Sequence, residues 1–242
     1  SCGIGQIGGQ TVVVIGQNRS KDPVSGEALR IMPEGFRKSQ RAIRIAEKFD
    51  LPIISLIDTP GANITLGAEN RGLAHSIATT MSLFSSQSSP TIAVVIGEGG
   101  SGGALSIGIA DKVIMLENAI YSAISPEEAA NLIYRDESRA NEVAETLKLT
   151  ASDCQSLGIV DLIVTEPEGS AHTEHHQAAR LLKRALLQQL FEVQNSSKRK
   201  RLRARYEKFK GIGEYSSHFR NRISRELNLL QHSITDKIKG FR

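Results

Sequence analysis

Apolar and polar residues alternate along this chain in two ways, which predict strands and helices in turn. Short apolar runs rich in β-branched residues are typical of buried strands. They cover residues 11–15, 51–57, 91–96 and 112–116. Between these runs, apolar residues recur at spacings of three and four, as expected of helices that bury one face. Strands that alternate with helices predict βαβ units with parallel pairing, and therefore an α/β fold.

The apolar spacing predicts helices over about 33–49 and 70–84. Two further helices have clear start signals. Ser125-Pro-Glu-Glu128 has a capping Ser, Pro at the first helical position and Glu three residues after the cap. Thr150-Ala-Ser-Asp153 is a similar start, and a final strand is expected over 159–164.

The last third of the chain is expected to be mainly helical. A long helix is predicted over about 173–193, and a break at 195–197 separates it from a basic helix. Apolar residues again recur at spacings of three and four over about 217–238. We expect this last amphipathic segment to dock on the body of the protein or on another chain.

Length and composition predict one main domain with appendages. The 242 residues are 40% apolar, which is enough for one full hydrophobic core. No apolar run approaches the 18 residues of a membrane span, and the first residues lack the layout of a signal peptide. We therefore expect no membrane association and a cytoplasmic location, or the stroma in a plastid-bearing organism. The chain begins at Ser1 within sequence typical of a domain interior, which suggests a preceding N-terminal segment.

The two cysteines do not indicate a metal site. Cys2 and Cys154 are far apart and outside any paired metal spacing. Neither a disulfide framework nor a zinc site is therefore expected, and we assign no metal to this chain.

The net charge of +4 conceals an uneven distribution. Residues 197–242 hold 14 Lys and Arg against 4 Asp and Glu, so residues 1–196 carry a net charge of −6. This contrast predicts a main domain over 1–196 and a basic helical extension over 197–242. The extension is suited either to nucleic acid or an acidic partner, or to packing as a helical arm along a neighbouring subunit. The arm is favoured and nucleic acid disfavoured, because no aromatic residues are interleaved as in nucleic-acid modules.

The strongest candidate for chemistry is a glycine-rich turn. After the apolar run 91–96 the chain reads Gly97-Glu-Gly-Gly-Ser-Gly-Gly103, then resumes as a small, apolar helix. A strand that turns directly into a helix leaves free N–H groups pointing at one place, which suits an oxyanion or a phosphate. Gly102 and Gly103 would supply the donors of an oxyanion hole, because a backbone without Cβ lets a planar ligand approach closely.

Two other functions remain open for this turn. Gly97-Glu-Gly-Gly-Ser-Gly102 also fits the dinucleotide fingerprint G-x-G-x-x-G, and Glu117 follows at the distance of a ribose-binding acid. The following helix is short for a dinucleotide fold, however, and the motif follows the third strand instead of the first. Ser101 formally fits the nucleophile pattern G-x-S-x-G, but the sequence shows no evident triad.

A second turn is expected to form the wall of the same site. Asp58-Thr-Pro-Gly-Ala62 ends the strand over 51–57, and its residues are equally typical of a structural turn. The functional alternative places it opposite the glycine turn. The candidate substrate-binding residues are Thr59, Pro60, Gly61, Ala62, Gly99, Gly100, Ser101 and Ala104.

Five motifs in order resemble those of one protein family. They are Pro33-Glu-Gly-Phe-Arg-Lys38, Ile57-Asp-Thr-Pro-Gly-Ala62, Gly67-Ala-Glu-Asn-Arg-Gly72, Ile96-Gly-Glu-Gly-Gly-Ser-Gly-Gly-Ala104 and Ile124-Ser-Pro-Glu127. Together they resemble the α subunits of bacterial acetyl-CoA carboxylase carboxyltransferases over roughly residues 1–215. The resemblance implies a crotonase-like (ClpP/crotonase) α/β fold, a spiral of βαβ units, with a C-terminal helical arm.

The resemblance also implies an activity. Such enzymes transfer the carboxyl group of carboxybiotin, borne on the biotin carboxyl carrier protein, to acetyl-CoA to form malonyl-CoA for fatty acid biosynthesis. The glycine pair that matches Gly102 and Gly103 stabilises the ureido oxygen of biotin. A zinc-containing β subunit supplies the acyl-CoA half of the site, so we expect an α2β2 assembly that is inactive without that subunit.

The chain departs from the family after Ala62. Where the family has Tyr-Pro-Gly, this chain has Asn63-Ile-Thr65, in a loop that bears on the choice of acyl-CoA. The alternatives are another biotin-linked acyl-CoA carboxyltransferase or decarboxylase subunit, a subunit with a scaffold role, and the dinucleotide-binding protein described above.

Overall fold

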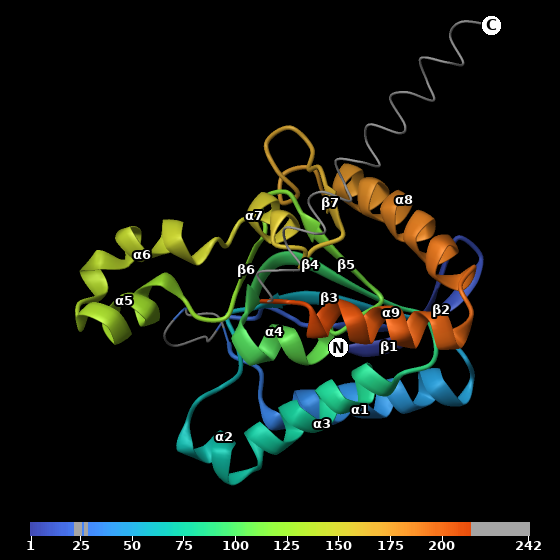
Figure 1. Ribbon diagram of the computed structural model, residues 1–242, viewed down its shortest axis with the longest axis horizontal. Helices are drawn as coiled ribbons and strands as arrows, with labels where there is room; N and C mark the ends of the chain where they lie inside the picture. The colour runs from blue at the N-terminus through green and yellow to red at the C-terminus, as the bar shows by residue number, and fades with distance from the viewer. Residues whose placement is uncertain (22–25, 27–28, 214–242) are drawn as a thin grey trace, which may run out of the picture.

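The computed structural model describes residues 1–21, 26 and 29–213, and within them a seven-stranded mixed sheet forms the centre of the molecule (Figure 1). The strands run in the order β1-β2-β3-β4-β5-β7, and β6 pairs with β4. Their bounds are β1 (Cys2–Ile7), β2 (Gln10–Gly16), β3 (Ile53–Thr59), β4 (Thr91–Gly100), β5 (Lys112–Leu116), β6 (Ile120–Ser122) and β7 (Leu162–Val164).

The helices follow the predicted alternation. They are α1 (Pro33–Lys48), α2 (Leu66–Asn70), α3 (Leu73–Ser86), α4 (Ser101–Gly108), α5 (Pro126–Tyr134), α6 (Ala140–Leu147), α7 (Ala151–Ser156), α8 (His175–Gln194) and α9 (Lys198–Lys210), with the 3₁₀ helix η1 (Glu137–Arg139) between α5 and α6. The predicted segment 217–238 lies outside the described residues.

The predicted parallel pairing is confirmed. β2, β3, β4, β5 and β7 are parallel neighbours, so their carboxyl ends lie along the same edge of the sheet. β4 is the longest strand and forks: Ile92–Val95 pair with β5, and Glu98–Gly100 pair with β6. The glycine-rich segment therefore lies where the sheet divides.

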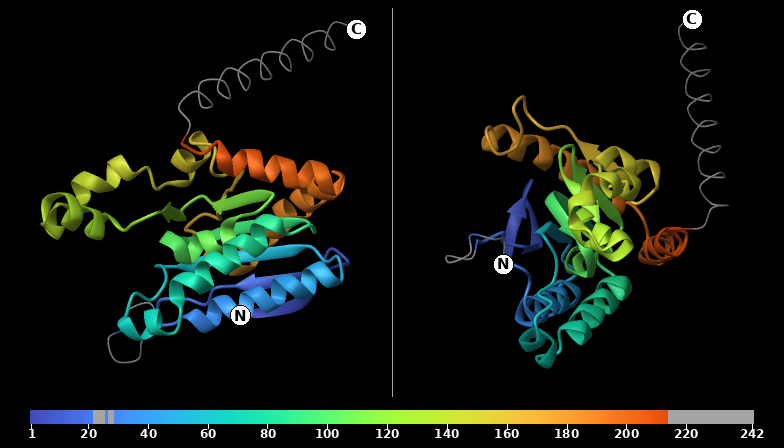
Figure 2. Two further views of the ribbon diagram at one scale, coloured as in Figure 1. Left: turned by 60° about the horizontal axis from the view of Figure 1, so that its bottom comes forward. Right: turned by 90° about the vertical axis from the view of Figure 1, so that its left-hand side faces the viewer.

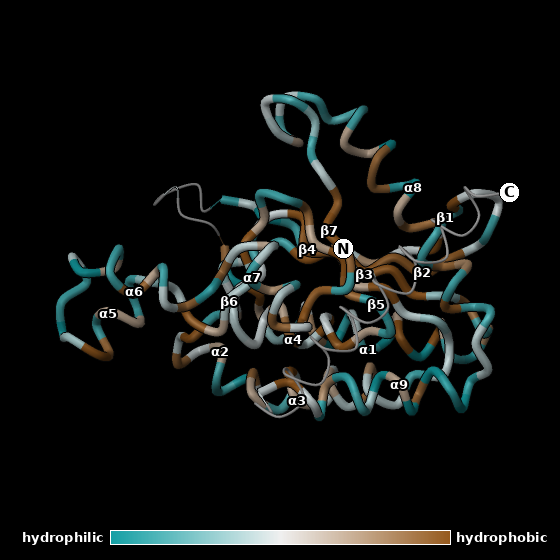
Figure 3. The backbone as a smooth tube through the Cα atoms, turned by 45° about the horizontal axis from the view of Figure 1, so that its top comes forward, coloured by the Kyte–Doolittle hydropathy of each residue, from teal (hydrophilic) through white to brown (hydrophobic). Residues whose placement is uncertain are grey.

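The hydrophobic core lies between this sheet and its helices. α1 and α3 lie side by side beneath the sheet, while α8 packs on β4 and β7 on the opposite side (Figures 1 and 2). The tube in Figure 3 is brown along the central strands, where Ile53, Ile92 and Ile114 are fully buried. α4 packs against β3, β4 and α3, so its first turn lies over the carboxyl edge of the sheet.

The helix-start signals are confirmed in detail. The Ser125 hydroxyl accepts a hydrogen bond from the Glu128 N–H, and the Glu128 carboxylate accepts one from the Ser125 N–H, which completes a capping box. The Thr150 hydroxyl likewise accepts the Asp153 N–H at the start of α7.

Two strands were missed by the sequence pattern. β1 pairs antiparallel with β2 through Gly8 and Gly9, whose positive φ angles of 56° and 82° suit a two-residue hairpin turn. β1 contains Gly3 and Gly5 in place of β-branched residues, so no apolar run marks it. β6 is only three residues long.

The basic arm lies on its own chain as far as the structure describes it. α9 packs against α3 through two arginines, and its packing along a neighbouring subunit stays a prediction. The Arg205 guanidinium is 2% exposed, pairs with Asp111 at 2.7 Å and donates to the carbonyls of Phe84 and Gln87. Arg201 donates to the Ser88 carbonyl at 2.8 Å. A cation at the carboxyl end of α3 is favoured by the helix dipole, which explains why the arm docks there.

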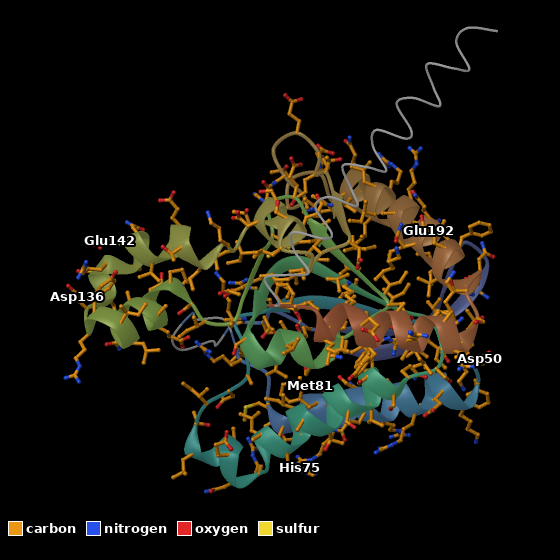
Figure 4. The ribbon with its side chains drawn as sticks, viewed as in Figure 1. Asp50, His75, Met81, Asp136, Glu142 and Glu192 are labelled. Carbon is orange, nitrogen blue, oxygen red and sulfur yellow. The ribbon has the colours of Figure 1, made fainter. Side chains whose placement is uncertain are left out.

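The pair α5 and α6 projects from the body as a separate arm (Figure 1). Asp136 and Glu142 lie at its outer end, far from the sheet (Figure 4). Hydrogen bonds from Ser138 lower the pKa of Asp136, and a hydrogen bond from Arg139 lowers the pKa of Glu142. These shifts have local causes, and we connect them with no catalytic role. Among the helices that the structure describes, none is long and apolar enough to cross a membrane.

Candidate active site

The candidate site is built where β4 ends and α4 begins. Gly97, Gly99 and Gly100 belong to β4, which corrects the expectation that they form a turn. The helix also begins earlier than expected, at Ser101 instead of Gly103. Gly102 and Gly103 are therefore its second and third residues, and their N–H groups lie among those that an α-helix leaves without a partner of its own. No side chain caps this helix, so its positive end stays free for a ligand.

The glycines are required because other backbone and side chains approach them closely. A Cβ on Gly97 would lie 2.7 Å from the Asp58 carboxylate, and one on Gly99 would lie 2.6 Å from the Tyr121 ring. A Cβ on Gly100 would lie 2.4 Å from the Pro60 carbonyl. The glycine content of this segment thus results from close packing of β4 against other parts of the chain. These contacts are not apparent from the sequence, because the residues that make them are distant along it.

The second turn packs directly beneath the start of α4. A Cβ on Gly103 would lie 2.7 Å from the Gly61 carbonyl carbon and 2.8 Å from the Ala62 nitrogen. The turn is held by the buried Thr59 hydroxyl, which donates to the Gly61 carbonyl and accepts the Gly61 N–H. The structure therefore brings together the two turns that the sequence placed on opposite sides of one site.

Ser101 has an unusual backbone conformation. Its φ is +52°, whereas none of the five glycines around it has a positive φ. A non-glycine residue in this region carries a cost of order 1 kcal/mol, and such residues gather at functional sites. The exposed Ser101 side chain stands at the first position of α4, at the mouth of a pocket.

This pocket is apolar and has a cavity volume of about 280 Å³. Its wall combines residues of α4 with residues from distant parts of the chain. Its lining residues are Ser101, Gly102, Leu105, Tyr121, Ser122, Ala123, Ile159, Phe209 and Ile212. A free helix N-terminus at the wall of an apolar pocket suits a ligand with an apolar ring and one anionic or strongly polar oxygen.

Only two of the predicted site residues, Ser101 and Gly102, line the pocket. The others lie behind it. Thr59, Gly61, Ala62, Gly99, Gly103 and Ala104 are buried, and Pro60 and Gly100 are partly buried. Sequence reasoning missed Tyr121, Ile159, Phe209 and Ile212, which come from β6, the α7–β7 connection and the end of α9. No local motif marks them.

Burial raises the pKa of two ionisable groups beside the pocket. Burial raises the pKa of Tyr121 to about 12, and the neighbouring Cys154 adds to the shift. Burial also raises the pKa of the Cys154 thiol to about 11, with a contribution from Asp153. Both groups are therefore uncharged at neutral pH.

The raised pKa of Tyr121 predicts a loss of stability at alkaline pH. The phenol must lose its proton at about pH 10 in the unfolded chain but at about pH 12 in the folded one, so its contribution is lost as pH rises through this window. We expect Tyr121→Phe to gain about 1 kcal/mol in unfolding free energy, relative to wild type, between pH 8 and pH 11. Urea unfolding at both pH values measures this gain, and equal differences at the two pH values would contradict it.

The alternative functions of the glycine segment find no support in these contacts. The Glu117 carboxylate, expected at a ribose, accepts the Glu166 N–H at 3.2 Å. Gly97, Gly99 and Gly100 extend a strand instead of wrapping a phosphate. Within residues 1–21, 26 and 29–213, no group of three His, Cys, Asp or Glu residues is arranged to hold a metal ion.

The segment Asn63-Ile-Thr65 forms its own capped turn. The Asn63 carboxamide oxygen accepts the N–H and hydroxyl of Thr65, and the Thr65 hydroxyl accepts the Ala68 N–H at the start of α2. Ile64 and Leu66 are left 74% and 76% exposed on this loop. The loop therefore presents two apolar side chains on its surface while its backbone stays tied to α2.

The sequence of the chain is similar to those of known carboxyltransferase subunits. Residues 1–213 match the family model described as "Acetyl co-enzyme A carboxylase carboxyltransferase-like". The acetyl-coenzyme A carboxylase carboxyl transferase α subunits of Staphylococcus aureus strains RF122 / ET3-1 and MRSA252 are each 48% identical to this chain over 216 residues. That alignment covers 88% of this chain and 69% of each relative.

Solved structures with similar folds include a malonate decarboxylase and a transcarboxylase. A chain of a Pseudomonas malonate decarboxylase hetero-tetramer in complex with coenzyme A aligns with a TM-score of 0.71 and 16% identity, over 95% of this chain and 90% of that one. Transcarboxylase 12S with methylmalonyl-coenzyme A bound aligns with a TM-score of 0.67 and 20% identity, over 81% of this chain and 36% of that one. These likenesses confirm the predicted crotonase-like α/β fold.

Proposed function

This chain belongs to the family of acetyl-coenzyme A carboxylase carboxyltransferase α subunits, and from that premise we propose that the first turn of α4 is its half of the active site. It is accordingly a subunit of a transferase. The observation that carries the proposal is the uncapped start of α4, which opens on an apolar pocket and is packed from behind on the turn at Gly61.

The residues present fit the polar head of biotin. When it is bound, carboxybiotin on its carrier protein supplies the carboxyl group that acetyl-CoA receives as malonyl-CoA. The N–H groups of Gly102 and Gly103 would hold the ureido oxygen, and backbone donors at this position would stabilise negative charge on it. Leu105 and Phe209 belong to the apolar wall of the same pocket. Donors fixed by the fold in a dry site stabilise developing charge without reorganising.

The buried residues of the predicted site have a supporting role in this proposal. Ser101, by contrast, is exposed and lines the pocket, where it would contact the ligand. Thr59, Pro60, Gly61 and Ala62 form the layer on which Gly100 and Gly103 rest, while Gly99 leaves room for the Tyr121 ring and Ala104 is buried. Because backbone N–H groups do not titrate, their contribution to the reaction is independent of pH.

The second half of the active site comes from a partner in this proposal. A zinc-containing β subunit binds the acyl-CoA and completes an α2β2 assembly, and acetyl-CoA is the acyl substrate because the relatives are acetyl-CoA carboxylase subunits. The location remains the one expected from the sequence, cytoplasmic or stromal.

Reconstitution tests the proposal. The chain is mixed with the β subunit of an acetyl-CoA carboxylase, and malonyl-CoA formation is measured with acetyl-CoA and the carboxylated carrier protein. We expect co-elution of the two subunits, and activity in the mixture but in neither subunit alone. A co-eluting mixture without activity, or equal activity of the chain alone, would contradict the proposal.

A further inference from the structure

We propose that Gln17 is a positioning residue for carboxyl transfer, because its carboxamide ties the first turn of α4 to the carboxyl edge of the sheet. The inference rests on the proposed function, in which that turn donates the catalytic hydrogen bonds. Gln17 does not touch the pocket and acts through Gly103.

Gln17 lies at the place where three strands end. It directly follows β2, and its own N–H donates to the Leu56 carbonyl of β3 at 3.0 Å. Its side chain Nε2 donates to the Gly103 carbonyl of α4 at 2.7 Å, while Oε1 accepts the Asp58 N–H of β3 at 3.2 Å. One partly buried amide therefore links the ends of β2 and β3 to the third residue of α4.

The Asp58 end of this link is itself held firmly. The Asp58 carboxylate accepts the Glu98 N–H of β4 at 3.1 Å and pairs with Arg19 at 3.3 Å. Arg19 also pairs with Glu98 at 2.9 Å. Gln17 is thus hydrogen-bonded to a network that already connects β3 and β4. Its bond to Gly103 extends this network to α4.

The start of α4 has few interactions of its own that would fix its position. No side chain caps it, and two of its first three residues are glycines, which lose more conformational entropy on ordering than any other residue. Gly103 packs on backbone atoms of the turn below, and its carbonyl belongs to the Gly103–Ala104 peptide, next to the peptide that carries the Gly103 N–H donor. The carbonyl of Gly103 is held by Nε2 of Gln17 on one side and by the Ser106 hydroxyl on the other, at 3.0 Å.

The inference has a specific kinetic consequence. A displacement of the donors of about 1 Å costs as much as a hundredfold in rate, because the hydrogen bonds must meet the charge where it develops. Loss of the Gln17 amide is therefore expected to lower kcat by about tenfold to a hundredfold. The KM for acetyl-CoA is expected to stay within twofold, because the acyl-CoA half of the site lies on the partner subunit.

The experiment compares Gln17→Met with the matched control Gln87→Met. The Gln87 side-chain amide also makes two hydrogen bonds. Its Nε2 donates to the Ile43 carbonyl and its Oε1 accepts the Ser89 N–H, both at 3.1 Å. It lies before β4, at the opposite edge of the sheet from α4. Gln17→Glu is a third variant, which keeps the acceptor for Asp58 but places a carboxylate against the Gly103 carbonyl. Each variant is assembled with the β subunit, and kcat and the KM for acetyl-CoA are measured.

A second readout does not depend on activity. Hydrogen exchange of the backbone over 99–105 is measured in the full isolated chain, and Gln17→Met is expected to speed it about tenfold while Gln87→Met leaves it unchanged. If the wild-type complex is active, a Gln17→Met complex whose kcat is within twofold of wild type overturns the inference, as does an equal fall in kcat for Gln87→Met. If the wild-type complex is inactive, the proposed function fails by itself. Unchanged exchange over 99–105 in Gln17→Met then overturns the tie between Gln17 and the first turn of α4, and faster exchange supports that tie alone.

Discussion

Gly103→Ala is expected to destabilise the protein by about 1–3 kcal/mol and to abolish carboxyl transfer. The added Cβ would lie 2.7 Å from the Gly61 carbonyl carbon, 2.8 Å from the Ala62 nitrogen and 3.0 Å from the Gly61 Cα. All three are backbone atoms of a turn that hydrogen bonds to Thr59 and Ile31 hold in place, so the clash is not relieved by a side-chain rotation. The helix start must move, and with it the N–H donors.

Gly102→Ala is the matched control for this prediction. A Cβ on Gly102 has the Ile77 side chain as its nearest neighbour, at 3.8 Å, which is ordinary contact. We expect its unfolding free energy to equal that of wild type within about 0.5 kcal/mol. Chemical denaturation of the two variants and wild type gives the comparison. Equal stability of Gly103→Ala and Gly102→Ala would show that the turn below α4 yields easily, contrary to the packing described.

Arg205→Met is expected to cost about 3–5 kcal/mol in stability, because it leaves a buried carboxylate without its partner. Asp111 is 6% exposed and pairs with the Arg205 guanidinium at 2.7 Å. The substitution also removes donors from the carbonyls of Phe84 and Gln87, at 2.6 and 2.9 Å. For a chain of this length the loss corresponds to a fall in Tm of about 10 °C.

Arg203→Met provides the comparison on the same helix. Arg203 is exposed, and its loss is expected to change stability by no more than about 0.5 kcal/mol. Thermal unfolding of both variants distinguishes the contribution of a buried cation to stability from that of an exposed cation on the same helix. Equal melting temperatures for Arg205→Met and wild type would mean that α9 does not depend on this ion pair for its place on the body.

Local signals in the sequence were sufficient for most regular elements. The strand at Lys112–Leu116 has the predicted bounds because all of its residues after Lys112 are apolar and buried. The helix after Ser125 begins as predicted because its capping box involves only residues three positions apart. The predicted candidate turns do meet, since both follow parallel strands that are neighbours in the sheet.

The same reasoning failed where structure depends on residues distant in sequence. Gly97, Gly99 and Gly100 looked like a turn because glycine favours turns, but each makes room for a side chain or backbone that lies 22 or more residues away. Arg205 looked like one of many exposed charges, yet its partner Asp111 lies 94 positions earlier. The pocket wall at Phe209 could not be predicted either, because it requires knowing that α9 folds back on its own chain.

The central claim is that the first turn of α4 is the part of this chain that takes part in carboxyl transfer. Gly102→Val tests it most directly, because a branched side chain at this position of the pocket wall obstructs access to the N–H donors. Gly3→Val is the control, since Gly3 is exposed on β1 with no heavy atom within 4 Å of an added Cβ.

The measurement is malonyl-CoA formation by each variant assembled with the β subunit, with assembly checked by size-exclusion chromatography. We expect both variants to assemble, Gly3→Val to retain wild-type activity, and Gly102→Val to lose at least about a hundredfold in kcat. Wild-type activity in an assembled Gly102→Val complex would contradict the assignment of the site.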